Sequence, residues 1–313
     1  MKLNKKIIPY VFVIIAFLIS SCDYYTTGTV DIVTGTRGLV VELIRSSMPP
    51  SIFEGDNLHM QVRLRNEGAL DIENGILYVS VDSQSFSVLN REEFESINLR
   101  GDDGIYRGEE SVHRVSLESK RFLAEGITAH DARISINACY EYGTFFQDTF
   151  CIDTDVSQQQ TDKPCRMSSL SGSRGQGAPV VVSRIEPRMT LGSTGAQLSF
   201  DVHIRNSGSG TVITSGSSER VCKGEFGMTD MNIVKLSEIK LSRFSLSEGD
   251  FICDSHTDNS NEFDLSASRD FVTCRLRDEL EFSEGTFSTP ITIELEYGYL
   301  QSINTNIKVE RAR

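Results

Sequence analysis

The chain has 313 residues, of which 39% are apolar and 24% are charged, a balance typical of a folded protein rather than a disordered one. Its formal net charge of −13 at pH 7 gives a surface that repels nucleic acid, so neither DNA nor RNA is expected as a partner. The length favours two domains.

The first 21 residues have the pattern of an export signal. Lys2, Lys5 and Lys6 precede the apolar run Ile7–Ile19, which is shorter than the roughly 20 residues of a membrane span. Small residues then precede Cys22, and this resembles the lipobox of prokaryotic lipoproteins. The resemblance implies that Cys22 is the site of lipid attachment and that the protein is exported and anchored at the extracytoplasmic face of the cell membrane. An ordinary signal peptide or an uncleaved anchor is the alternative.

Cysteine usage supports export. Cleavage before Cys22 removes three lysines and no acid, which takes the net charge from −13 to −16, and it leaves six other cysteines. An even number in an exported chain predicts three disulfides. The six are Cys139, Cys151, Cys165, Cys222, Cys253 and Cys274. Neither a metal centre nor a cofactor is expected, because the sequence has no C-x-x-C pair and its five histidines are scattered.

Short runs that alternate between apolar and polar residues fill most of the chain, and this period is typical of half-buried strands. The clearest run places Leu58, Met60, Val62 and Leu64 on one face. Since Gly, Asn, Asp and Ser separate such runs and no long helical period occurs, the sequence predicts an all-β fold of β-sandwiches. Further strands are expected at 39–44, 76–81, 86–89, 112–117, 251–253 and 271–276, with one or two strands at 231–246 and a helical turn at 91–94.

Two segments of the first half recur in the second half in the same order. Gly55–Gly68 matches Gly195–Gly208 at an offset of 140 residues (55 to 195), and Ile134–Ile152 matches Ile291–Val309 at an offset of 157 (134 to 291). The second half therefore holds 17 more residues in its middle, and a tandem duplication is predicted. The expected organisation is a signal peptide at 1–21, a tether at 22–37, sandwich domains at 38–156 and 179–313, and a Gly/Ser-rich linker at 157–178.

Each of the longer matching segments is interpreted as a hairpin that closes one sandwich. A bridge between Cys139 and Cys151 across the first hairpin then lies on its outward, solvated face. The second copy has Glu296 and Lys308 at these positions, an opposite-charge pair suited to such a face. Phe145 is placed at the turn, where an exposed aromatic ring is a candidate partner contact; packing against a neighbouring loop is the alternative.

The remaining cysteines and the acidic loop give weaker signals. F-I-C-D-S and F-V-T-C-R look like facing strands, which favours Cys253–Cys274 as a bridge and leaves Cys165–Cys222. Oxygen ligands for Ca²⁺ are available in the loop between these strands, but the EF-hand spacing is missing and a solvated loop is the simpler interpretation. The weak candidate ligands are Asp254, Asp258, Glu262 and Asp264. Arg100-Gly101-Asp102 matches the integrin-binding tripeptide, a match that chance explains.

The motif G-D-x-L-x-x-x-V-x-L-R-N-x-G at 55–68 resembles the start of the cell-adhesion-related (CARDB-like) immunoglobulin-like domain of bacterial and archaeal surface proteins. The cysteine-framed Y-x-Y strand and the G-Q-G-A-P before a valine run are similar to those of uncharacterised two-domain exported proteins of archaea. The resemblance covers most of residues 38–311. It implies two tandem immunoglobulin-like sandwiches in a surface setting, and no chemistry.

No catalytic motif is evident in the sequence: G-x-S-x-G, H-E-x-x-H and the Walker A motif are all missing. The expected function is therefore that of a non-enzymatic cell-surface lipoprotein, which mediates adhesion or holds a protein partner at the outer face of the cytoplasmic membrane. The alternative is an accessory structural subunit of a pilus, a surface layer or another envelope complex. An enzyme whose site is assembled from separated residues is the third hypothesis.

Overall fold

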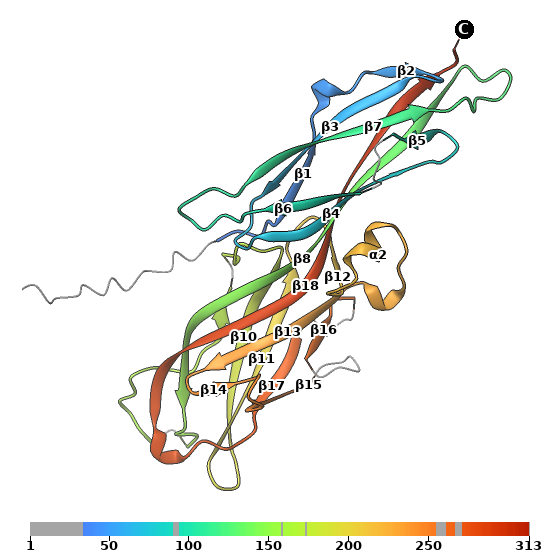
Figure 1. Cartoon of the computed structure of the whole chain (residues 1–313). Helices are drawn as coiled ribbons and strands as arrows, with labels where there is room; N and C mark the ends of the chain where they lie inside the picture. Colours follow the sequence, from blue (N-terminus) through green and yellow to red (C-terminus); the bar gives the residue numbers. More distant parts are fainter. Residues whose placement is uncertain are drawn as a thin grey trace, which may run out of the picture. The chain divides into compact units, whose positions relative to one another are not determined.

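The computed structural model of the chain describes residues 34–89, 94–157, 159–172, 174–254, 261–266 and 271–312 (Figure 1). The predicted signal peptide, Cys22, most of the tether and residues 91–93 of the predicted helical turn lie outside the described residues. Within the described ranges, no helix combines the length and hydropathy that a membrane crossing requires.

The described chain is almost entirely β-structure, which confirms the predicted all-β class. Its strands are β1 (Leu39–Leu43), β2 (Ser51–Phe53), β3 (Asn57–Asn66), β4 (Ile72–Val81), β5 (Phe86–Val88), β6 (Phe94–Leu99), β7 (Glu110–Ser119), β8 (Ala129–Asp153), β9 (Leu170–Ser171), β10 (Val180–Leu191), β11 (Ala196–Asn206), β12 (Thr211–Ile213), β13 (Ile233–Leu241), β14 (Phe244–Ser245), β15 (Phe251–Asp254), β16 (Glu262–Asp264), β17 (Phe271–Leu276) and β18 (Thr286–Glu310). The helical pieces are short: η1 (Arg45–Ser47), α2 (Ser218–Cys222), η2 (Met228–Asp230) and η3 (Phe282–Glu284).

The described strands form three sheets. The N-terminal sheet has the order β1-β3-β7-β5, and the C-terminal sheet has the order β15-β17-β11-β10-β9. The third, the shared sheet, has the order β14-β13-β18-β8-β4-β6, with β2 and β12 also paired to β18 and β16 to β13. The N-terminal sheet lies over one end of the shared sheet and the C-terminal sheet over the other end (Figure 1). We refer to these two ends as the first and the second lobe.

Two strands of 25 residues each, β8 and β18, form the centre of the shared sheet. They pair antiparallel without a register shift, from Asp153 opposite Thr286 to Ala129 opposite Glu310. The two predicted hairpins are therefore wrong, because each proves to be part of one continuous strand. Gly143, close to the predicted turn, instead lies where the two strands approach each other closely: a Cβ atom on it would lie 2.9 Å from the carbonyl oxygen of Leu295.

Each long strand serves both lobes. The first part of β8, Ile134–Cys139, pairs with β4 in the first lobe, while β13 pairs with the first part of β18 in the second lobe. Ile136 pairs with Ile303 of β18, not with a residue that follows it closely in β8. The strand expected to close the first lobe thus lies in the second lobe, and the last part of β18 takes its place. The two halves of the chain have exchanged their closing strands.

The core follows the alternation seen in the sequence. Leu58, Met60, Val62 and Leu64 of β3 are fully buried, as predicted from their common face. In the second lobe, Phe150 of β8 packs edge-on against Phe200 of β11, with ring centroids 5.8 Å apart. These contacts join the shared sheet to the sheet on either end of it, and hydrophobic burial of this kind is the main stabilising contribution to folding.

The cysteines form three disulfides, as predicted, but two of the predicted pairings are wrong. The bonds are Cys139–Cys222, Cys151–Cys165 and Cys253–Cys274. Only Cys253–Cys274 was predicted. Because β8 continues straight, Cys139 and Cys151 lie 12 residues apart on one strand, or about 40 Å at ~3.4 Å per residue, and cannot bond.

The charged pair expected in the second hairpin is absent for the same reason. Glu296 and Lys308 lie on one strand, and each has a different partner. Lys235 Nζ lies 3.0 Å from Glu296, and Glu310 lies 2.9 Å from Lys308 Nζ.

The 17 additional residues of the second half lie in the excursion between β12 and β13, which contains α2 and η2. The first half has a continuous β4 here, with a register irregularity between Ile72 and Gly75. The excursion folds back over the centre of β8, where Cys222 of α2 bonds to Cys139. Cys139 was expected on a solvated face, but the excursion covers it and it is fully buried.

Candidate functional site

Four buried tyrosines lie where the two long strands pass from one lobe to the other. Tyr142 pairs with Tyr297, and Tyr140 with Tyr299. Neighbouring rings have centroids 5.5 to 6.4 Å apart, in tilted or edge-on contact. Burial raises the pKa of each hydroxyl, so all four stay protonated at neutral pH.

Each tyrosine hydroxyl accepts a hydrogen bond from a backbone N–H of a neighbouring segment. The donors are Leu39 to Tyr140 (2.9 Å), Leu70 to Tyr142 (3.1 Å), Val180 to Tyr297 (3.4 Å) and Gly210 to Tyr299 (2.9 Å). The bonds of Tyr142 and Tyr299 correspond under the two offsets found in the sequence, since 142 and 299 differ by 157 and 70 and 210 by 140. The cluster therefore fastens both halves of the chain at equivalent points.

The excursion that contains α2 is hydrogen-bonded to β8 between Tyr140 and Tyr142, through Glu141. The carboxylate of Glu141 accepts hydrogen bonds from Ser215 Oγ (2.9 Å), the backbone N–H of Gly216 (3.1 Å) and Ser218 Oγ (2.5 Å). Val221 and Cys222 close a small apolar cluster beneath it. The excursion thus seals the point at which the strands exchange, and beyond that point it exposes Met228 to 96%.

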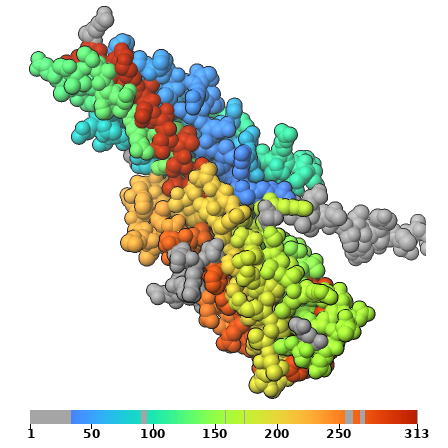
Figure 2. Space-filling model, turned by 180° about the vertical axis from the view of Figure 1, so that it is seen from behind, coloured from blue at the N-terminus to red at the C-terminus, as the bar shows by residue number. Residues whose placement is uncertain are grey.

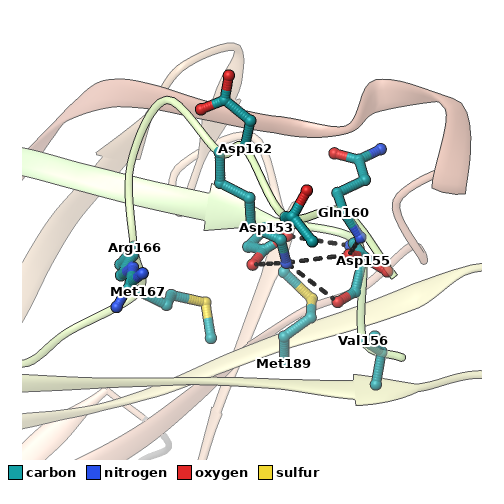
Figure 3. A pocket seen from close by; sticks show the side chains of 10 residues that line it. Asp153, Asp155, Val156, Gln160, Asp162, Arg166, Met167 and Met189 are labelled. Atoms are coloured by element: carbon teal, nitrogen blue, oxygen red, sulfur yellow. Dashed lines mark hydrogen bonds and ion pairs between the residues drawn. The ribbon is translucent and has the colours of Figure 1, made fainter. Parts of the chain in front are cut away.

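A polar cleft of about 670 Å³ lies beside the Cys151–Cys165 bridge (Figure 3). Its centre is Lys163, whose Nζ lies 2.7 Å from Asp153 and 3.1 Å from Asp155. Asp155 also accepts the backbone N–H groups of Gln159 (3.0 Å) and Gln160 (2.8 Å), which lower its pKa to about 2. Figure 3 shows Asp162 pointing away from this group.

The cleft offers an ion-paired loop rather than a reactive group. Its two aspartates raise the pKa of Lys163, so its amine is held as the ammonium ion and is no nucleophile. Arg166, Met167 and Met189 complete the lining. Cys165 of the predicted linker was expected to bond to Cys222, but it bonds to Cys151 instead. This bridge and the Lys163 ion pairs fasten the first part of the linker to the end of β8.

Among the described residues of the first lobe, the β6–β7 loop presents the most exposed apolar pair. Ile105 is 77% exposed and Tyr106 is 64% exposed. Asp103 Oδ1 accepts the backbone N–H groups of both residues, at 2.9 and 2.6 Å, so the turn that holds them is ordered by its own hydrogen bonds. The pKa of Asp103 is lowered by these two bonds.

The base of this loop is also fixed. Gly101 is buried and donates its N–H to Asp71 Oδ1 at 2.7 Å, and Asp102 donates its own to the carbonyl of Gly68 at 2.7 Å. The Arg100-Gly101-Asp102 tripeptide is therefore part of the anchor of the loop and not its displayed end. Sequence reasoning missed Ile105 and Tyr106, although two large apolar residues between two glycines were the available signal.

The other predicted site residues are not brought together. Phe145 lies in the middle of β8, opposite Glu294, and not at a turn as predicted; its ring is 47% exposed on the outward face of the shared sheet. Of the weak Ca²⁺ candidates, Asp258 lies outside the described residues. Asp254 ends β15 and Glu262 begins β16, while Asp264 accepts hydrogen bonds from the Ser266 backbone and hydroxyl.

A group with metal-ligand chemistry occurs on the C-terminal sheet. One ligand atom each of Glu186, Asp201 and His203 lies within 4.8 Å of the others. Each carboxylate already forms an ion pair, since Arg188 lies 2.5 Å from Asp201 and Arg184 lies 2.8 Å from Glu186. The arrangement is an ion-pair network between β10 and β11, and an added cation would compete with two guanidinium groups.

Comparisons with known proteins give no family. No family model matches the chain, and no curated protein does. Among solved structures, the chain is compared with the CupB6 tip adhesin from Pseudomonas aeruginosa at a TM-score of 0.16 and 8% identity, over 89% of this chain and 98% of that one. A likeness at this level supports no inference about fold or function.

Proposed function

We propose that this protein is a non-enzymatic cell-surface lipoprotein that binds a partner or mediates adhesion at the extracytoplasmic face of the membrane. It consists of two immunoglobulin-like sandwiches related by duplication, and Cys22 carries its lipid anchor. The three disulfides support an oxidising compartment outside the cytoplasm. While bonded, these six cysteines carry no free thiol that could act as a nucleophile or a metal ligand.

The exposed Ile105–Tyr106 pair is the observation that carries this proposal. Two large apolar side chains in water cost free energy that burial against a partner recovers, at roughly 25 cal/mol per Å². The turn that holds them is already ordered by Asp103, so little conformational entropy is lost on binding. A tyrosine beside an aliphatic residue on a rigid turn is also the composition enriched at the energetic centre of protein interfaces.

A photocrosslinking residue at position 106 in the full chain, displayed on its native cells, tests the proposal. We expect a discrete adduct from position 106, which Ile105→Ser reduces. The matched control places the same group at Leu191, which is 71% exposed on the other lobe, and yields no such adduct. Equal labelling from both positions, or none from either, contradicts the proposal.

The lipid anchor is tested separately by the intact mass of membrane-extracted protein. The anchor is supported if the measured mass exceeds that of the chain from Cys22 onward by the mass of acyl groups. This excess should be absent from the Cys22→Ala variant. A mass equal to the full chain of 313 residues contradicts it.

A further inference from the structure

The pairing of β8 with β18 is symmetric about its centre. Glu141 pairs with Gly298, and these residues differ by 157, the offset at which the sequences of the two strands match. The two tyrosine pairs on either side of Glu141 are exchanged by the same offset. Each strand thus pairs with its own counterpart about an approximate twofold axis, which is the geometry of an isologous interface between two copies of one unit.

Each half of the chain is completed by a strand of the other half. In Figure 2 the last part of β18, in red, lies between blue and green segments of the first lobe. In the second lobe the end of β8 pairs with the start of β18, and Phe150 of β8 packs against Phe200 of β11. None of these contacts requires that the two partners belong to the same chain.

Glu141 makes the pairing selective for the opposite half. Two first halves paired about the same axis would place one Glu141 opposite another, and like charges directly opposite each other destabilise a sheet. Gly298 carries no charge, and the excursion that contains α2 donates three hydrogen bonds to the Glu141 carboxylate. The fitting partner of a first half is therefore a second half.

The covalent connection between the halves contains one loosely held segment. Cys165 is bonded to Cys151 of the first half, and Leu170 pairs with Ile185 of the second half. Between them, Arg166–Ser169 form no hydrogen bond with any other described residue, and three of these four residues are exposed. A change of direction in this hinge costs few contacts, and the hinge can span about 17 Å from Cys165 to Leu170 at ~3.4 Å per residue.

We propose that two copies of this chain exchange halves, so that the first half of each copy pairs with the second half of the other. β8 of one copy then pairs with β18 of the other in the register of the single chain. Exchange of identical elements is a low-cost route to a dimer, because every contact is remade and only the hinge changes. The linker gives the halves of one chain a high effective concentration, so the exchanged form increases with the number of copies that fold together. This interface is separate from the β6–β7 loop and does not depend on it.

The Cys139–Cys222 bond records the exchange. Cys139 belongs to the first half and Cys222 to the second, so in the exchanged dimer this bond joins two chains. Both cysteines are buried, with 0% and 1% of their surface exposed, so two closed molecules cannot form the bond by collision. The Cys151–Cys165 bond lies within the first half and stays within one chain in either form.

Complementation between two full-length variants with different tags tests the proposal. Cys139→Ala and Cys222→Ala are expressed together, and neither can form the bond within its own chain. Exchange brings the remaining Cys139 to the remaining Cys222, so a covalent heterodimer with both tags is expected on a non-reducing gel. Cys151→Ala expressed with Cys165→Ala is the matched control, in which exchange does not bring the remaining cysteines together. No heterodimer from the first pair, or an equal amount from the control pair, overturns the proposal.

The chain with all its cysteines gives a second measurement, which does not depend on how the variants fold. Two differently tagged wild-type copies are expressed together, and a covalent dimer with both tags is expected to increase with expression level. Deletion of Ser168 and Ser169 is expected to raise the dimer fraction, because a short hinge hinders closure within one chain, and a flexible insertion at the same place is expected to lower it. A wild-type chain that stays monomeric at every expression level, or a dimer fraction that does not respond to hinge length, contradicts the exchange.

Discussion

The hydroxyl of Tyr142 stabilises the place where β8 and β18 pass from one lobe to the other. Tyr142 accepts the Leu70 N–H at a largely buried site, so Tyr142→Phe leaves that donor unpaired. A loss of about 1–2 kcal/mol in the free energy of unfolding is expected, measured by urea denaturation. Tyr106→Phe, at an exposed position, serves as the control and is expected to change stability little. An equal loss from both variants would show that the hydroxyl of Tyr142 contributes nothing specific.

Asp155 gives a residue-scale prediction for pH. Its backbone hydrogen bonds and Lys163 lower its pKa to about 2, below the usual 3.8. A lowered pKa in the folded state means that its contribution to stability is present above about pH 4 and is lost as the pH falls toward 2. Carboxyl NMR titration should show this low midpoint, and Lys163→Met should raise it. A midpoint near 3.8 in the wild-type chain would refute the described contacts.

Among the elements, the excursion that contains α2 and the linker are each joined to β8 by one disulfide, and the two bridges close loops of very different length. Cys139–Cys222 spans 83 residues and Cys151–Cys165 spans 14. The chain-entropy model gives about 4–5 kcal/mol for the longer loop and about 3 kcal/mol for the shorter one. The double variant Cys139→Ala/Cys222→Ala should therefore lose more stability in urea than Cys151→Ala/Cys165→Ala. The reverse order would mean that native-state contacts, rather than loop closure, decide the difference.

The strands could be predicted from the sequence, but their partners could not. The alternation at β3 and β13 follows from which face is buried, a local property, and it was interpreted correctly. A hairpin with a weak turn and one straight strand have the same alternation, so the pattern at 134–152 did not distinguish them. The decisive fact is that Ile303 pairs with Ile136, a contact between distant parts of the chain.

The candidate sites were less predictable still. The exposure of Ile105 and Tyr106 depends on how the β6–β7 loop is anchored at Asp71 and Gly68, which no local pattern reports. α2 was missed because five residues are too few to establish a helical period. Two of the cysteine pairings failed together with the hairpin from which they were inferred.

For the whole molecule, the exchange of closing strands makes a prediction about fragments. A protease site inserted between Ser168 and Ser169, both exposed, allows the linker to be cut in the folded protein. The two fragments are expected to stay together on size-exclusion chromatography even after reduction, because β8 and β18 remain paired over 25 residues each. If each half closed its own hairpin, reduction would separate them. Uncut protein under the same reducing conditions is the control.

The continuous pairing of β8 with β18 also sets the order of events during synthesis. β8 is complete when the ribosome reaches Asp153, but its partner β18 is the last of the described strands to emerge. Until then the first lobe lacks a central strand of its sheet, and β8 offers an open edge to other nascent chains. Pairing between such distant segments is intrinsically slow, since a long loop must close before any contact forms. Either lobe is therefore completed only after β18 has been synthesised.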